Sequence, residues 1–239
     1  DSPDVPRDIN ALITALEGNV GYPATRDILD TGIPLHTAVG RVLTAADFTA
    51  IGLAIPHGLW LATAVNPQND QSGNALNLTN KGAITFGVGI DGAAASSPIF
   101  AGSTAQAFYY ADAGANDPFR LPQSGTASVW FKSSKLGQQQ WLMSKLRWNG
   151  NASAWGMYIS AQGLLAFTWS INGTNMLTIG GGMRVVDDCW HLATATWDAT
   201  NVKLYLDGVM EAQGYPTTYF FVSDGPFKLG SAHADASQI

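Results

Sequence analysis

The segment from Trp190 to Leu206 constrains the fold of this chain more than any other. Apolar and polar residues alternate with a period of two from Trp190 to Trp197 and again from Val202 to Leu206, which is the period of a β-strand. The four residues between the two runs, Asp-Ala-Thr-Asn, are typical of a tight turn. An Asp-Gly pair at 207–208 follows the second run and predicts a further hairpin turn. The segment therefore predicts consecutive antiparallel strands in a mainly β protein.

The alternation also sorts the first strand into two faces. One face carries Trp190, Leu192, Thr194 and Thr196, and the other carries His191, Ala193, Ala195 and Trp197. We expect the core to include Trp130, Trp190, Leu192, Leu204 and Leu206. Cys189 is the only cysteine, and we expect it to be a small buried apolar residue. His191 is expected to have a structural role.

Composition narrows the class of protein. The 239 residues include 26 Gly and 11 Pro, with 46% hydrophobic and 13% charged residues. This profile favours a turn-rich β protein over a disordered chain. The net charge of -6 and the lack of any basic cluster argue against nucleic acid as a partner. No apolar run approaches the roughly 18–20 residues that a membrane-spanning helix needs, so we expect no membrane insertion.

The pattern W-H-x-x-x-T-x-D followed by V-x-L-Y-x-D-G, from Trp190 to Gly208, resembles the laminin-G-like domains of the concanavalin A-like class. Other phrases carry the same resemblance: D-x-S-G-N from Asp70 to Asn74, and the predicted strands at 99–103, 127–133 and 227–230. The resemblance covers about residues 58–232 and implies an antiparallel jelly-roll sandwich that presents loops to sugars and receptors. Members usually continue past the Leu-Gly phrase at 229–230 into a closing strand, so we expect the sandwich to lack its last strand or to be closed by another element.

The N-terminal residues predict a short helix over 4–17, within a helical and irregular anchoring segment (residues 1–56) that precedes the sandwich domain (residues 57–239). Asp4 can cap this helix, Pro6 fits its first turn, and Gly18 follows its end. The apolar stripe of the helix consists of Ile9, Leu12, Ile13 and Leu16. A helix this short needs a packing partner. The alternatives are its own sandwich, a larger assembly, or other copies of the chain, for which we expect a trimer.

The opening phrase D-V-P-R-D-I-x-A-L resembles the openings of bacteriophage tail-fibre and related virion proteins. This resemblance implies a component of a fibre, a tail tip or a decorated capsid on the virion surface. Its expected partners are other virion proteins, bound through the N-terminal segment, and glycans of the host surface or the environment. The alternative is a carbohydrate-binding module of a secreted or cell-surface bacterial enzyme or adhesin.

The loop at 148–155 is the candidate ligand site of the sequence. Trp148 and Trp155 flank a polar stretch that contains Asn149 and Asn151. Aromatic faces stack on sugar rings and amides bind hydroxyl groups, so these four residues are the predicted glycan-binding set. The alternative is an ordinary wide turn. Trp130, Trp169 and Trp190 lie in strongly apolar strands and are expected in the core.

Calcium is a second possibility at this loop, because pentraxin-like relatives of the fold bind it at the equivalent position. The resemblance would bring Asn149, Asn151 and Asp235 together, but these segments contain no Glu, which leaves few oxygen ligands. We therefore expect no cofactor.

Asp70 and Asn74 are expected to hold their turn through hydrogen bonds to the backbone, with a metal role for Asp70 as the alternative. Gly180–Gly182 are expected to form a hairpin turn.

The scarcity of Glu argues against catalysis. Glycosidases of this fold use two closely spaced carboxyl groups, and the chain has only Glu17 and Glu211, which fall in separate predicted elements. Asp187 and Asp188 are adjacent, so in a strand their side chains would face opposite ways. We therefore expect a non-enzymatic protein that displays a lectin-like, glycan-binding domain.

Overall fold

The computed structural model describes residues 56–61, 65–90, 92–101, 106–121, 123–147, 152–216 and 218–231. The predicted helix over 4–17 and nearly all of the predicted anchoring segment lie outside these residues. The part of the chain that is described contains no helix long and apolar enough to cross a membrane.

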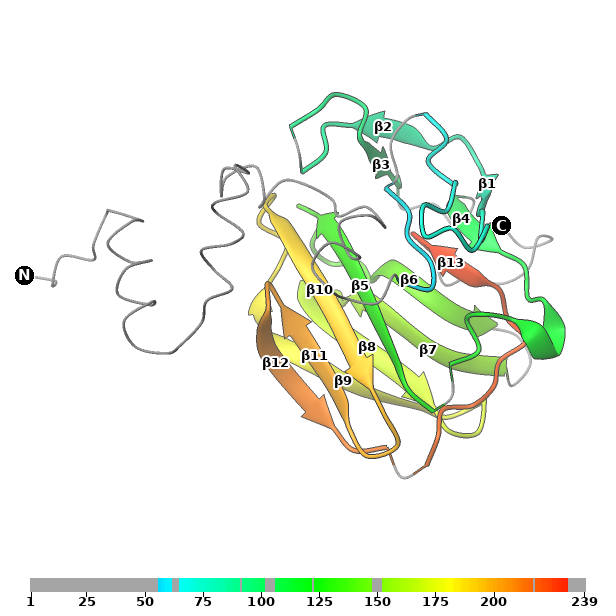
Figure 1. Ribbon diagram of the computed structural model, residues 1–239. Coiled ribbons are helices and arrows are strands. Elements are labelled where there is room, and N and C mark those ends of the chain that lie inside the picture. The colour runs from blue at the N-terminus through cyan, green and yellow to red at the C-terminus, as the bar shows by residue number, and fades with distance from the viewer. Residues whose placement is uncertain are drawn as a thin grey trace, which may run out of the picture. The chain divides into compact units, whose positions relative to one another are not determined.

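Two antiparallel sheets packed face to face form the domain (Figure 1). The larger sheet has seven strands in the order β1-β4-β13-β6-β7-β8-β9, the smaller has four in the order β12-β11-β10-β5, and β2 and β3 form a separate hairpin. The strands are β1 (Thr79–Lys81), β2 (Thr85–Gly87), β3 (Ser97–Ile99), β4 (Ala107–Tyr110), β5 (Gly125–Lys132), β6 (Gln140–Arg147), β7 (Ala152–Ile159), β8 (Leu164–Ser170), β9 (Met176–Arg184), β10 (Trp190–Trp197), β11 (Val202–Leu206), β12 (Val209–Gly214) and β13 (Phe227–Leu229). One 3-10 turn, η1 (Gly114–Asn116), is the only helical element of the described residues. The predicted jelly-roll-like sandwich is confirmed.

The strands predicted from the alternation are present with the predicted turns. β10 pairs with β11, and β11 pairs with β12 across the Asp207-Gly208 turn. Both turn residues have positive φ values, 50° and 83°, as the two-residue turns that suit hairpin twist require. β13 lies inside the larger sheet between β4 and β6, so the Leu-Gly phrase at its end belongs to an internal strand.

The inward face of β10 is the opposite of the predicted one. Ala193 and Ala195 are fully buried and Trp197 is 4% exposed, whereas Trp190 and Leu192 are only half-buried on the outer face. Trp130 on β5 also points outward and is 37% exposed. The small side chains of Ala193 and Ala195 leave room between the sheets, and the outward register keeps the hydroxyl groups of Thr194 and Thr196 out of an apolar core. The core predictions for Leu204 and Leu206 are confirmed.

Aromatic rings fill the space between the sheets. Trp197 packs on Phe220 with ring centroids 5.4 Å apart, on Trp155 at 5.3 Å and on Phe167 at 5.6 Å. The Trp197 indole N–H donates to the carbonyl of Leu121 at 3.0 Å, which satisfies its polar group. Rings from both sheets thus share one core, and Trp169 belongs to it as predicted.

A buried lysine ties the loop around η1 to the larger sheet. The ammonium of Lys145 on β6 is fully buried and lies 2.9 Å from Asp112 and 3.0 Å from Asp117. Arg120 also bonds to Asp112. Burial acts to raise the pKa of Asp112, but hydrogen bonds from Arg120 and Lys145 outweigh it and hold that pKa well below its usual range. The cluster is internally paired, as buried charges must be.

Asp70 organises the turn that precedes β1, as predicted. Its carboxylate accepts hydrogen bonds from the backbone N–H groups of Leu59, Ser72 and Leu76 and from the Ser72 hydroxyl, at 2.6–3.0 Å. The Asn74 amide donates to the carbonyl of His57 at 2.8 Å. Because four donors occupy the Asp70 carboxylate, its role in this structure is to hold the turn.

Two further predictions about local structure are wrong. Gly180–Gly182 lie within β9 and form no hairpin turn. Glycine suits this strand because the Glu211 side chain from β12 packs against it: a Cβ on Gly181 would lie 3.0 Å from a Glu211 carboxylate oxygen. That carboxylate accepts the Gly182 N–H at 2.9 Å and so joins the edges of the two sheets. Cys189 is exposed rather than buried, because the chain bends before β10 begins.

His191 has the structural role predicted for it. Its Nδ1 lies 2.8 Å from Asp207 and its Nε2 lies 3.1 Å from Asp187. Asp207 also accepts the backbone N–H of Leu192 at 2.7 Å. The imidazole therefore connects the turn between β11 and β12 with the bend that precedes β10.

Candidate functional site

The structure contradicts one member of the predicted ligand set. Trp155 lies on the inward face of β7, is 3% exposed and packs on Trp197 and Phe227. It has no free face for a sugar ring, because the strand alternation that follows the loop turns it into the core. Trp148, Asn149, Asn151 and Asp235 lie outside the described residues, so their roles in glycan or calcium binding stay predictions. Within the described residues, no cluster of three or more His, Cys, Asp or Glu side chains could hold a metal ion.

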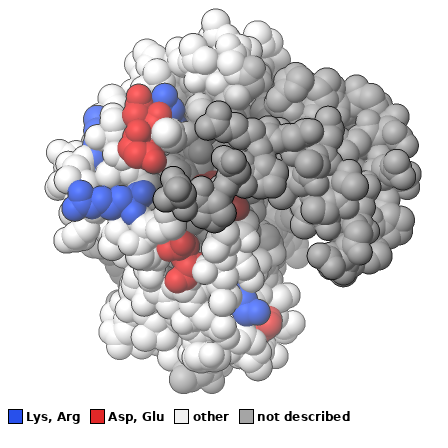
Figure 2. Space-filling model, turned by 90° about the vertical axis from the view of Figure 1, so that its left-hand side faces the viewer, with Lys and Arg blue, Asp and Glu red and all other residues white. Residues whose placement is uncertain are grey.

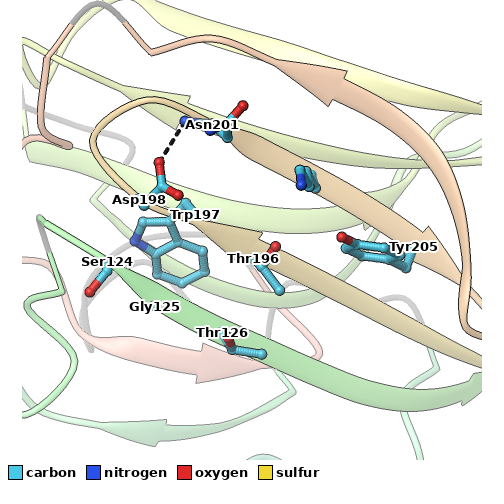
Figure 3. Close-up of a pocket in the computed structure, with 9 residues that line it drawn as sticks. Ser124, Gly125, Thr126, Thr196, Trp197, Asp198, Asn201 and Tyr205 are labelled. Carbon is cyan, nitrogen blue, oxygen red and sulfur yellow. Dashed lines mark hydrogen bonds between the residues drawn. The ribbon is translucent and has the colours of Figure 1, made fainter.

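An open pocket of about 330 Å³ lies at one end of the four-stranded sheet (Figure 3). It is lined by Ser124, Gly125, Thr126, Thr196, Trp197, Asp198, Asn201, Lys203 and Tyr205. These residues come from the start of β5, the end of β10, the turn that follows it, and β11. The pocket is thus built mainly by the β10–β11 hairpin, with the start of β5 beside it.

Strand register brings the central polar residues into one row. Thr196 on β10 is paired with Thr126 on β5 and with Lys203 on β11. Neighbouring strands lie about 4.8 Å apart, and paired side chains point to the same face. Tyr205 follows two residues after Lys203 on the same face of β11, opposite Thr194. The row therefore presents hydroxyl groups and one ammonium group beside a phenol ring.

The turn at one border of the pocket is fixed by its own side chains. One oxygen of Asp198 accepts the backbone N–H groups of Thr200 and Asn201, each at 2.7 Å, and the Thr200 hydroxyl at 2.8 Å. These bonds, led by the one from the Thr200 side chain, lower the pKa of Asp198. The Asn201 side chain binds the Thr200 hydroxyl and accepts the Gln213 amide at 2.8 Å. The turn is therefore preorganised, with an ionised carboxylate in the pocket wall.

Gly125 lines the pocket and also packs directly against the core residue Trp197. A Cβ on Gly125 would lie 2.3 Å from Cζ2 of Trp197, so any side chain here would displace the indole ring. Figure 3 shows this ring between Gly125 and the end of β10. The absence of a side chain at Gly125 thus keeps both the pocket wall and the Trp197 ring in place.

Five polar side chains of the lining have no partner among the residues that the structure describes. Within the described part of the chain, no hydrogen bond or ion pair engages the hydroxyl groups of Ser124, Thr126, Thr196 and Tyr205 or the ammonium of Lys203. The adjacent row differs, because the Ser128 and Thr194 hydroxyl groups bond to each other at 3.0 Å. The pocket therefore offers hydrogen-bonding groups that the described part of the chain does not use.

Sequence reasoning did not find this pocket, although a signal was present. Two threonines share the face of β10 that was expected to be the core, and burying both hydroxyl groups without partners would be costly. The cost of burying Thr194 and Thr196 therefore indicates that their face of β10 is exposed to solvent. The pocket itself arises from the pairing of three strands, which a single strand pattern cannot specify.

The face of the molecule in Figure 2 is mainly uncharged. Acidic and basic side chains lie on it singly or in small groups, and over its described part the basic residues do not gather into a patch. The described part of this face therefore lacks the basic patch that binding to a nucleic-acid backbone requires.

Two antiparallel sheets packed face to face place the domain in the class of antiparallel β-sandwiches. The family model of the concanavalin A-like lectin/glucanases superfamily matches residues 108–238, which is more than half of the chain. The chain belongs to this superfamily. No curated protein sequence matches it.

Solved structures share the fold at low sequence identity. The binding domain of Paraclostridial Mosquitocidal Protein 1 has a TM-score of 0.54 and 16% identity, over 70% of this chain and 42% of that one. The receptor binding domain of botulinum neurotoxin C/D mosaic serotype has a TM-score of 0.50 and 12% identity, over 70% and 41%. Domain 4 of an extracellular arabinanase from Geobacillus stearothermophilus, in complex with arabinotriose, has a TM-score of 0.50 and 18% identity, over 70% and 80%. The chain thus spans less than half of either of the first two binding domains.

Proposed function

We propose that this domain is a non-catalytic glycan-binding module and that its ligand occupies the pocket on the four-stranded sheet. The observation that carries the proposal is the set of five polar side chains in the lining that have no partner within the described ranges of the chain. Sugars present many hydroxyl groups, which both donate and accept hydrogen bonds, and Tyr205 adds an aromatic surface for a ring.

The chemistry of the lining supports binding rather than hydrolysis. Asp198 is the one carboxylate among the lining residues, and three donors of its own turn hold one of its oxygens. Glycoside hydrolysis needs two carboxyl groups that flank one bond. Release of product from a polysaccharide by the purified domain would overturn the non-catalytic part of the proposal.

The arabinanase domain supports a sugar ligand, because that protein binds arabinotriose on a related sandwich. Two settings fit such a module. The N-terminal phrase favours a bacteriophage virion surface, where many copies would strengthen weak binding. The arabinanase comparison favours a module of a secreted bacterial enzyme or adhesin. Light scattering separates them, since we expect a trimer in the first setting and a monomer in the second.

Substitution of the unpartnered groups tests the site. Thr196→Val removes one hydroxyl group at nearly constant shape, and Tyr205→Ala removes the ring. The double variant should lose retention on a glycan array and keep its melting temperature. Ser128→Ala is the matched control, because Ser128 lies one row away on the same face and outside the lining.

Unchanged retention by the double variant, together with loss on Trp148→Ala, would move the site to the predicted loop at 148–151. Unchanged retention by both variants would place it elsewhere. Trp155 is excluded from this test because its substitution would damage the core.

A further inference from the structure

The charge of Lys203 has no counter-charge among the described residues. The chain carries 18 acidic and 12 basic residues, so a lysine on its surface has many carboxylates from which to gain a partner. Yet within the described residues no carboxylate lies within 4.0 Å of the Lys203 ammonium. Its cross-strand neighbours are Thr196 and Gln213, which are both uncharged.

The acidic residue of the pocket does not fill this role. Asp198 directs one oxygen at its own turn, where three donors bind it. Lys132 shows the contrast, because at the far end of the same sheet face it pairs with Asp188 at 3.3 Å. Lys203 is half-buried beside Tyr205 and Thr196, where its stem packs on the sheet and its ammonium remains available to a ligand.

We propose that the ligand of this pocket is an anionic glycan, in which a carboxylate or sulfate group on one sugar pairs with Lys203. The inference rests on the proposed function and names its substrate class. Thr126 and Thr196 would bind hydroxyl groups of the same sugar, since the three residues form one row across adjacent strands. Tyr205 lies about 7 Å further along β11, which is within the reach of a neighbouring ring.

The test compares glycans that differ at their anionic group. The probes are galacturonate oligosaccharides and their methyl esters, and sulfated galactan oligosaccharides with their desulfated forms. The unaltered protein should prefer the anionic member of at least one pair by about tenfold, the scale of one charge-assisted hydrogen bond. The preference should weaken as salt is added. The galacturonate and galactan arms distinguish a carboxylate from a sulfate ligand.

Three variants assign the preference to Lys203. Lys203→Gln should reduce binding of the anionic member to the level of its neutral counterpart and leave the neutral member unchanged. Lys203→Arg should retain the preference. Lys132→Gln is the control for loss of a positive charge on the same sheet face and should have no effect.

The possible failures are distinct. If both members of every pair bind equally and Thr196→Val weakens both, the glycan site stands and the anionic ligand is wrong. If an anionic preference survives Lys203→Gln, the charge is read elsewhere and the inference is wrong. If no probe is retained by the unaltered protein but other glycans of the array are, the inference is wrong and the proposed function stands. If nothing on the array is retained either, both are wrong.

Discussion

At the scale of single residues, the two tryptophans of β10 differ in how much they stabilise the fold. Trp197 is 4% exposed among rings from both sheets, whereas Trp190 lies half-buried on the outer face. Trp197→Ala should lower the free energy of unfolding by about 3–5 kcal/mol through lost burial and a cavity. Trp190→Ala should cost about 1–2 kcal/mol. Urea denaturation of the two variants checks the order, and a larger loss for Trp190→Ala would contradict the register.

His191 makes stability depend on pH. Burial of the ring opposes protonation, but the hydrogen bonds to Asp207 and Asp187 outweigh it and raise the pKa of His191 above 6.5. Folding therefore favours the protonated ring. This contribution is fully present below pH 6.5 and is lost as the pH rises through the raised pKa of the folded state. The melting temperature should fall over that range in the unaltered protein, and the fall attributable to this ring should vanish in His191→Gln. An equal fall in both proteins would assign the effect to another group.

At the scale of elements, the start of β5 depends on the absence of a side chain. Gly125→Ala places a Cβ 2.3 Å from the Trp197 ring, so the ring or the strand must move. We expect a loss of about 1–3 kcal/mol in the free energy of unfolding and a shift in tryptophan fluorescence. Gly182→Ala is the control within another strand, because nothing lies within 4 Å of its added Cβ. Equal melting temperatures for both variants would contradict this packing.

The sequence specifies strands and turns better than it specifies faces and sites. Period-two patterns predicted β10 and β11, and the Asp-Gly pair predicted their hairpin with β12, because these signals are local. The inward face of β10 depends on which rings arrive from the opposite sheet, and small residues such as Ala193 supply the space they need. The glycines of β9 resemble a turn in the sequence. The reason that glycine stands there is the Glu211 side chain, which packs against the strand and is distant in the sequence. The pocket depends on three strands in register, so its residues could not be grouped from the sequence.

At the scale of the whole molecule, the assembly of the chain is the main prediction that the described residues do not reach. The apolar stripe predicted at 9–16 should be covered by other copies of the chain. Leu12→Asp combined with Leu16→Asp should convert a trimer into a folded monomer, because charged groups would be buried in the contact. Light scattering measures the mass, and far-ultraviolet circular dichroism verifies that the sandwich persists. A monomeric mass before the change, or unfolding after it, would contradict the prediction.

The carboxylate of Glu211 has a consequence for whether one molecule can pair with another through its sheet edges. It occupies backbone donors on β9, at a border where an incoming strand from a second molecule would otherwise find them free. Glu211 therefore links the edge strands β12 and β9 on a side where a strand of a second molecule could otherwise have been added. Two copies brought side by side along this border would therefore find fewer free backbone donors through which to join their sheets.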